Sequence, residues 1–167
     1  LGGPEVRYNA TDLLELGANF VVIGEGEETT LELINRLEMK NRNDFKNING
    51  IGFKDDNGKI IFNAERSLIS DIDTLPFPNR SGIDIRKYQE AWKKHHNLDA
   101  ISVSTMRGCP YTCRWCSRAV YGLTYRRRSP EKVVEELQKI KDEYNPDTIW
   151  FVDDVFTISH KWLTGFN

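Results

Sequence analysis

The feature that most restricts how this chain can fold is the short stretch 107–116, which holds all three of its cysteines. Cys109, Cys113 and Cys116 follow the spacing C-x3-C-x2-C. Thiolates this close together on one loop can converge on a single soft metal centre, because the metal deprotonates each thiol that it binds. An odd number of cysteines at such short separations cannot all pair as disulfides. The sequence therefore predicts a metal-binding loop.

The number of thiolates separates the kinds of metal centre. A structural zinc site closes with four protein ligands, and a ferredoxin-type cluster uses four cysteines. Three thiolates would leave one iron of a cubane 4Fe-4S cluster open to an external ligand. Two other interpretations stay open, a zinc site completed by His95 or His96 and three unrelated core cysteines. Both histidines lie upstream of the loop, and buried cysteines rarely gather in this way beside arginines.

The loop, with an aromatic residue directly before its last cysteine and an apolar strand ahead of it, resembles the signature of radical S-adenosylmethionine (SAM) enzymes. The resemblance implies that Cys109, Cys113 and Cys116 hold a 4Fe-4S cluster. It also implies that the amino and carboxylate groups of SAM chelate the fourth iron, and that the backbone of Trp115 contacts adenine. The reduced cluster would then split SAM into methionine and a 5′-deoxyadenosyl radical, which removes a hydrogen atom from a small-molecule substrate.

A second resemblance concerns the start of the chain. Gly2-Gly3-Pro4 and the segment 22–29 (Val-Ile-Gly-Glu-Gly-Glu-Glu-Thr) are similar to the last part of the cobalamin-binding domain that precedes many radical SAM cores. In that domain the turn formed here by Gly2 and Gly3 passes close to the nucleotide tail of cobalamin. The D-x-H-x-x-G motif of the family would lie upstream and is absent. We expect the intact protein to bind cobalamin, and we expect this chain, which begins without methionine, to be a fragment.

The first part of the chain reads as a helix, a strand and a second helix. A helix is expected over 9–16, ended by Gly17, and the apolar run 20–23 predicts a buried parallel strand. The next helix has four apolar residues among its positions, and the polar stretch 39–46 should end it. Together these elements predict a βα unit of a doubly wound sheet. The four apolar residues are Leu31, Leu33, Ile34 and Leu37.

The glycines of segment 24–29 do not predict a nucleotide site. The segment lacks the third glycine of G-x-G-x-x-G, and its three glutamates would repel a pyrophosphate. A tight turn with acids at a helix N-terminus is the simpler interpretation.

The middle of the chain predicts a hairpin and an extended linker. The β-prone runs 48–53 and 59–62 flank an Asn-Gly turn. Prolines exclude a helix over 72–78, where Leu75 and Phe77 should pin the linker to a domain face. A short helix is expected within 83–94, with Tyr88 and Trp92 as packing residues.

The last part predicts a βαβ unit. A strand over 99–105 leads into the cysteine loop, and a helix starts with Ser129 as N-cap. Asn145-Pro146 ends this helix, and a second strand follows over 148–152. Chemistry gathers at the carboxyl ends of strands in parallel barrels, so the loop and Asp153-Asp154 should lie close together. The helix should bury Val133, Val134, Leu137 and Ile140.

Asp153 and Asp154 stand where the radical SAM family holds the amino group of SAM. Many members show Gly-Gly-Glu there, and the difference leaves open which aspartate contacts SAM. Either aspartate could instead cap a helix around 159–162. The basic run 126–128 could be solvated surface or could pair with carboxylates.

The fold class expected is α/β: the C-terminal part of a Rossmann-like cobalamin-binding domain (1–45), a linker with a β-hairpin (46–98), and the N-terminal part of a TIM-like radical SAM core (99–167). A net charge of −2 argues against a nucleic-acid partner, and no apolar run is long enough to cross a membrane. Unpaired cysteines favour the cytoplasm. A flavodoxin or ferredoxin would supply electrons, and cobalamin would serve methyl transfer, cyclisation or rearrangement. The alternatives are a zinc-binding interaction module and an electron-transfer iron-sulfur protein.

Overall fold

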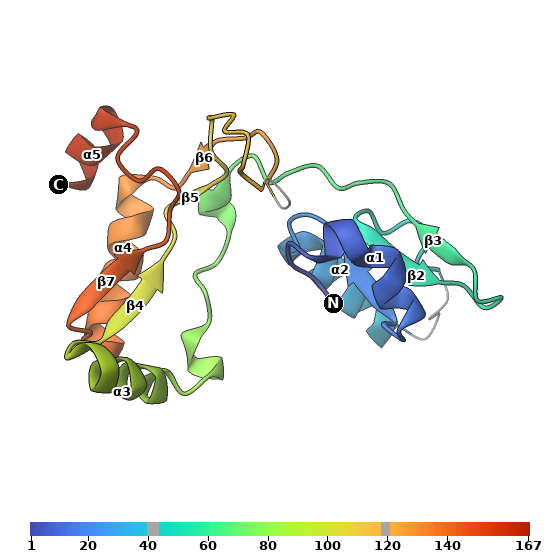
Figure 1. The fold of residues 1–167 in the computed structure, drawn as a ribbon, viewed down its shortest axis with the longest axis horizontal. Coiled ribbons are helices and arrows are strands. Elements are labelled where there is room, and N and C mark those ends of the chain that lie inside the picture. The colour runs from blue at the N-terminus through green and yellow to red at the C-terminus, as the bar shows by residue number, and fades with distance from the viewer. Residues whose placement is uncertain (40–43, 118–120) are drawn as a thin grey trace. The chain divides into compact units, whose positions relative to one another are not determined.

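A computed structural model describes residues 1–39, 44–117 and 121–167 (Figure 1). The chain divides into two compact units. The first contains Leu1–Ile69 and Thr112–Leu123, and the second contains Ser70–Tyr111 and Thr124–Asn167. Residues 40–43 of the polar stretch that we predicted as a helix end lie outside the described residues.

The first unit is built on a three-stranded sheet in the order β1-β2-β3. Its strands are β1 (Phe20–Val22), β2 (Ile51–Lys54) and β3 (Ile60–Phe62), and both pairings are antiparallel. We predicted a parallel strand at β1, whereas its pairing with β2 is antiparallel. On the other edge, Leu1 donates to the carbonyl of Phe20 at 2.8 Å and accepts from Val22 N at 2.8 Å, which is the parallel pattern.

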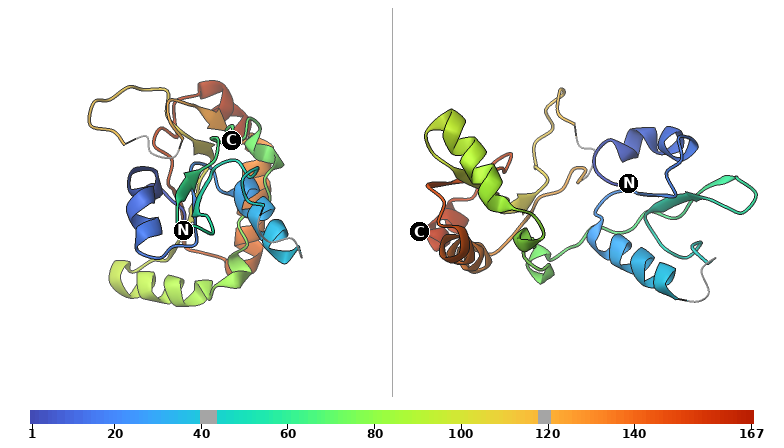
Figure 2. Two further views of the ribbon diagram at one scale, coloured as in Figure 1. Left: turned by 90° about the vertical axis from the view of Figure 1, so that its right-hand side faces the viewer. Right: turned by 90° about the horizontal axis from the view of Figure 1, so that it is seen from below.

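Two helices cover opposite faces of this sheet, α1 (Val6–Glu15) and α2 (Glu27–Glu38) (Figure 2). Successive residues of a strand point to opposite faces, so Val21 packs with Leu14 of α1 and Val22 packs with Leu33 of α2. Of the four apolar residues named above for α2, Leu33 is buried. The helix turns Thr29 and Leu33, four residues apart, toward the sheet, and Leu31, Ile34 and Leu37 remain exposed.

The predicted hairpin is confirmed, with β2 and β3 joined through a tight turn. One carboxylate oxygen of Asp55 accepts from the backbone N–H groups of Asn57 at 3.0 Å and Lys59 at 2.9 Å. Gly58 adopts a φ of +77°, a conformation that side chains rarely allow. Because β2 also pairs with β1, the hairpin belongs to the sheet of the first unit.

The acidic turn before α2 anchors the segment that follows the hairpin. Glu25 is buried, and its carboxylate accepts from the backbone N–H of Ile69 at 2.7 Å. Arg66 donates to the buried hydroxyl of Thr29 at 2.8 Å and pairs with Glu32. The carboxylates of Glu25 and Glu32 therefore hold residues 66–69 in place. The sequence suggested only that the acids of this turn are favourably placed at the N-terminus of a helix.

The second unit contains the predicted βαβ unit. Strands β4 (Ala100–Val103) and β7 (Thr148–Phe151) pair in parallel, with Ile101 opposite Ile149. Helix α4 (Pro130–Tyr144) connects them and buries Ile140 against the apolar side chains of β4. Ser129 caps α4 by accepting from Lys132 N at 3.2 Å, as predicted. No helix in the described ranges is long and apolar enough to cross a bilayer.

A pair of aspartates clamps the amino ends of the two parallel strands. Asp147 N donates to the Asp99 carboxylate at 2.9 Å, and Asp99 N donates to the Asp147 carboxylate at 3.0 Å. Lys93 donates to the same Asp147 carboxylate at 2.9 Å. The hydrogen bond from Lys93, together with the backbone N–H of Asp99, lowers the pKa of Asp147 below its ordinary value.

The linker between the hairpin and β4 runs along α4. The short 3₁₀ turns η1 (Ile72–Thr74) and η2 (Arg80–Gly82) flank an extended stretch, as its prolines predicted. The Asp73 carboxylate accepts from Ser129 N, and the Lys139 ammonium lies 4.4 Å from the ring centroid of Phe77. The linker is thus fixed to the first and third turns of α4.

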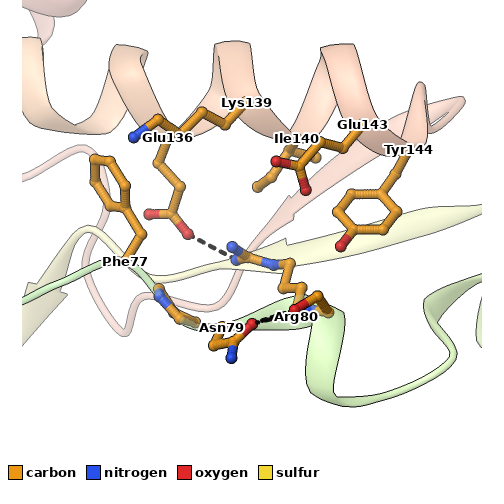
Figure 3. A pocket seen from close by; sticks show the side chains of 10 residues that line it. Phe77, Asn79, Arg80, Glu136, Lys139, Ile140, Glu143 and Tyr144 are labelled. Atoms are coloured by element: carbon orange, nitrogen blue, oxygen red, sulfur yellow. Dashed lines mark hydrogen bonds and ion pairs between the residues drawn. The ribbon is translucent and has the colours of Figure 1, made fainter.

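A buried carboxylate at the centre of α4 completes this attachment (Figure 3). Glu136 is 2% exposed and pairs with Arg80 at 2.7 Å and with Arg128. The residues around it line a small pocket between the linker and α4. We predicted that Val134 would be buried, and this is wrong: it is 47% exposed, because α4 turns Glu136 toward the arginines.

Helix α3 (Ile85–His96) precedes β4 and ends at Asn97, which adopts a left-handed conformation. Trp92 packs on Trp150 with ring centroids 5.5 Å apart, as a packing residue should. Tyr88, predicted to pack as well, is 66% exposed. The buried residue of this helix is Gln89, which donates to Asp99 and to the carbonyl of Tyr144.

Glu136→Gln should lower the free energy of unfolding by about 3–5 kcal/mol, because it leaves two largely buried guanidinium groups without a counter-charge. Urea denaturation measures the effect. Glu135→Gln is the matched control, since Glu135 makes only exposed pairs with Lys132 and Lys139, and should change stability by less than about 1 kcal/mol. Equal effects of the two substitutions would contradict the role assigned to Glu136.

Asp147→Asn should weaken the response of the fold to acid. A carboxylate with a lowered folded pKa stabilises the protein above its unfolded pKa, and this contribution is lost as pH falls through the folded pKa. The melting-temperature difference between wild type and variant should therefore be full at pH 7 and shrink below about pH 4. Thermal scans across this range test it, with the exposed Asp56→Asn as control. A difference independent of pH would contradict this account.

Candidate functional site

The cysteine loop leaves the second unit through a narrow neck that the sequence did not reveal. Strand β5 (Met106–Arg107) pairs antiparallel with β6 (Arg126–Arg127), with Met106 opposite Arg127. Each strand is only two residues long, which is too short to show the alternation of a strand, so periodicity gave no signal. The neck follows the carboxyl end of β4 directly, where a parallel βα fold places its chemistry.

Gly108 is the tightest point of the neck. Its φ is +77°, and a Cβ added there would lie 2.2 Å from the carbonyl oxygen of Thr124. The atom that such a Cβ would meet belongs to the backbone and cannot turn away as a side chain could, so no side chain fits at this position. The residue directly before Cys109 must therefore be glycine.

All three cysteines are described and carry thiols. Cys109 belongs to the second unit, and Cys113 and Cys116 belong to the first, where Cys116 N donates to the carbonyl of Cys113 at 3.3 Å. In the described ranges, no group of three or more His, Cys, Asp or Glu side chains is arranged to hold a metal ion. The donor set itself, three thiols within 109–116, suits three irons of a cubane cluster. Trp115 is 89% exposed.

The two histidines considered as zinc ligands lie at the wrong end of β4 for Cys109. His95 and His96 end α3, just before the amino end of β4, whereas Cys109 follows the neck beyond its carboxyl end. Four strand residues alone span about 13 Å. The ring of His96 lies 4.5 Å from that of Trp92, which gives it a packing role.

The two candidate aspartates at the end of β7 lie in different surroundings. Asp153 is half-buried and accepts four hydrogen bonds from residues 104–106, including Thr105 N at 2.8 Å. Asp154 is exposed, and none of the hydrogen bonds found between described residues uses its carboxylate. Neither caps the following helix α5 (His160–Phe166), because Ser159 does so through Trp162 N at 3.3 Å.

The basic run 126–128 is not a solvated surface. Arg127 donates to the carbonyl of Phe156 at 2.7 Å, and its guanidinium lies 3.6 Å from the ring centroid of Trp162. Arg128 pairs with Glu136 and donates to the carbonyl of Ser104 at 3.1 Å. The sequence raised pairing with the carboxylates of an anionic cosubstrate, whereas the carboxylate that Arg128 contacts belongs to the protein itself.

Gly2 and Gly3 lie at the carboxyl end of β1, where open α/β sheets bind ligands. Leu1 is aligned with β1, and a Cβ on Gly2 would touch only Val22, at 3.9 Å. Gly3 has a φ of +103°, and apart from its chain neighbours no atom of the described ranges lies within 4 Å of the position of a Cβ. This open glycine turn fits the approach of a bulky ligand to the backbone.

The chain is similar to curated enzymes over most of its length. It is 36% identical to an uncharacterized methyltransferase of Pyrococcus horikoshii over 164 residues, which are 96% of this chain and 34% of that protein. It is 33% identical to the anaerobic magnesium-protoporphyrin IX monomethyl ester cyclase of Synechocystis over 141 residues, 81% of this chain and 26% of the cyclase. The chain thus spans about a third of the length of these relatives or less. No family model matches it.

Solved structures share its fold. The cobalamin-dependent S-adenosylmethionine radical enzyme OxsB, with aqua-cobalamin and S-adenosylmethionine bound, superimposes with a TM-score of 0.70 at 22% identity, over 92% of this chain and 20% of OxsB. The radical S-adenosylmethionine methyltransferase TsrM of Kitasatospora setae, with cobalamin and a [4Fe-4S] cluster bound, gives 0.66 at 19% identity, over 94% of this chain and 31% of TsrM.

Gly108→Ala should destabilise the neck beyond the strain of its backbone conformation. Gly122→Ala is the matched control, because Gly122 has a φ of +60°, and among the described residues other than its chain neighbours no atom lies within 4 Å of its Cβ position. Strain alone costs about 1–2 kcal/mol, and only Gly108→Ala adds the clash with Thr124. Thermal unfolding should show a clearly larger loss for Gly108→Ala. Equal losses would mean that the close approach is not maintained.

Proposed function

Since the chain belongs to the radical SAM superfamily, among the proteins that carry a cobalamin-binding domain, we propose that it forms part of an enzyme that cleaves SAM reductively to make a 5′-deoxyadenosyl radical. One observation carries the proposal. A C-x3-C-x2-C loop follows the carboxyl end of the first strand of a parallel βαβ unit. The relatives named above support methyl transfer as the outcome, with cyclisation as the second candidate.

The three thiols are the residues that would hold a 4Fe-4S cluster. Cys109, Cys113 and Cys116 would bind as thiolates, one to each of three irons, and leave the fourth iron for SAM. A cluster bound in this way supplies one-electron reduction of the SAM sulfonium. The electron would come from a small carrier such as a flavodoxin or ferredoxin.

The chain's own contribution is to orient the cluster and SAM. The neck sets where the loop begins, since Gly108 allows the backbone at 108 and 124 to approach so closely. The exposed carboxylate of Asp154, at the end of β7, would accept a hydrogen bond from the SAM ammonium. The backbone at Trp115 would contact adenine.

Cobalamin would bind at the carboxyl end of β1. The open turn of Gly2 and Gly3 would let a bulky nucleotide tail approach the backbone. When bound, cobalamin supplies a carrier for a methyl group. Methyl transfer from SAM leaves S-adenosylhomocysteine, whereas radical cyclisation leaves methionine and 5′-deoxyadenosine. The substrate would be a small organic molecule.

Anaerobic reconstitution with iron and sulfide, followed by low-temperature EPR of the reduced protein with and without SAM, tests the proposal. We expect a cubane signal that shifts when SAM is added, because SAM would ligate the open iron. Cys113→Ala should lose the signal. Met39→Ala should keep it, because Met39 is exposed and lies well before the cysteine loop in the sequence. A colourless protein with one bound zinc, or a cluster that does not respond to SAM, would contradict the proposal.

The same reconstituted protein distinguishes the two outcomes. S-Adenosylhomocysteine formed together with 5′-deoxyadenosine, measured by mass spectrometry, would identify methyl transfer. 5′-Deoxyadenosine and methionine alone would show SAM cleavage without methyl transfer.

A further inference from the structure

Thr105 lies between β4 and the neck, and its N–H, hydroxyl and carbonyl groups all form hydrogen bonds. It is fully buried; its N–H donates to one oxygen of Asp153 at 2.8 Å, and its hydroxyl donates to the other at 2.5 Å. Its carbonyl accepts from Arg128 N at 2.9 Å. One residue thus ties the end of β7 to both the strand that enters the neck and the segment that leaves it.

The carboxylate of Asp153 accepts backbone and hydroxyl donors from residues 104–106. Besides the two bonds from Thr105, it accepts from Met106 N at 3.2 Å and from the hydroxyl of Ser104 at 3.1 Å. Three of these four contacts fall on Oδ1, and the Ser104 hydroxyl, which has one proton, also lies 2.9 Å from the carbonyl oxygen of Met106. Each carboxylate oxygen has about two lone-pair positions, so Oδ1 is fully used by residues 104–106, whereas Oδ2 accepts from the Thr105 hydroxyl and keeps one position.

Arg127 extends the network to the last helix. Its Nη2 donates to the Thr105 hydroxyl oxygen at 3.3 Å and to the carbonyl of Phe156 at 2.7 Å. The guanidinium lies 3.6 Å from the ring centroid of Trp162, whose indole N–H donates to the Arg128 carbonyl at 2.7 Å. Both strands of the neck are therefore held from the side of β7 and α5.

We propose that Asp153 is a positioning residue that fixes the backbone at 104–106, and so the start of the cysteine loop, through Thr105 and Arg127. Asp154, whose carboxylate is exposed, is then the aspartate at the end of β7 that is better placed to contact SAM. The consequence for the cluster rests on the function proposed above, whereas the backbone role does not.

Amide hydrogen exchange, measured on the protein without cluster, tests the backbone role. In Asp153→Asn one acceptor oxygen is lost, and in Thr105→Val the hydroxyl donor is lost. Both should speed exchange at Thr105 and Met106 by about tenfold, the factor expected for loss of a charge-assisted hydrogen bond. Thr105→Ser, which keeps the hydroxyl, should remain within about threefold of wild type. Wild-type exchange rates in Asp153→Asn would overturn the proposal.

Iron content and SAM affinity then separate positioning from ligand contact. After reconstitution, Asp153→Asn and Thr105→Val should each lose at least about half of the bound iron, whereas the exposed control Asp142→Asn should not. A SAM dissociation constant that rises about tenfold in Asp153→Asn, with iron content and exchange unchanged, would instead make Asp153 a SAM contact. If wild type takes up no cluster, the proposed function fails, and the exchange measurement still decides the role of Asp153. Thr105→Val carries the test if Asp153→Asn does not fold.

Discussion

The parallel pairing of β4 with β7 is the constraint on which the candidate site depends. Parallel strands share a carboxyl edge, so this pairing brings the entry to the cysteine loop next to Asp153 and Asp154, far apart in sequence. The reciprocal bonds of Asp99 and Asp147 fix the register at the amino end. At the other end the Asp153 carboxylate does the same for residues 104–106. Hydrogen bonds of aspartate carboxylates at both ends of the strand pair thus position the cysteine loop, which follows a strand of only four residues.

The rest of the second unit supports this edge through buried charge. Glu136, on the helix that crosses between the strands, holds Arg80 of the linker and Arg128 beyond the neck. Both arginines also donate to carbonyls of the segment 102–104. Such a network is weak evidence for net stability, but it specifies one geometry, because each charge finds its partners only when linker, helix and neck are in place. The cofactors would carry the difficult chemistry, and the protein would orient them.

The sequence predicted the elements whose signals are local. The Ser129-Pro130 start of α4, the hairpin around Asp55–Gly58 and the βαβ unit all rest on cap, turn and period rules that act within a few residues. The three thiols could be identified as possible metal ligands for the same reason, because they lie within eight residues of one another in the sequence. In the first unit, β1 pairs antiparallel with β2, and the choice of partner depends on tertiary contacts that an apolar run does not encode.

What could not be predicted depends on partners distant in sequence. Glu136 looks like a solvent-facing residue until Arg80 and Arg128 are placed beside it, and its burial turns Val134 outward. The neck escapes detection because two-residue strands have no period. The different roles of Asp153 and Asp154 follow from their positions relative to Thr105, and adjacent identical residues give no hint of this. In each case the sequence showed the type of side chain, but it did not show which residues that side chain contacts in the folded protein.

Mössbauer spectroscopy of protein reconstituted with ⁵⁷Fe, recorded with and without SAM, tests the central claim most directly. Three cysteine ligands and one open position should make one iron of four spectroscopically distinct once SAM is bound, while the other three remain unchanged. Four irons that stay equivalent when SAM is added, or a protein that takes up no iron, would contradict the account.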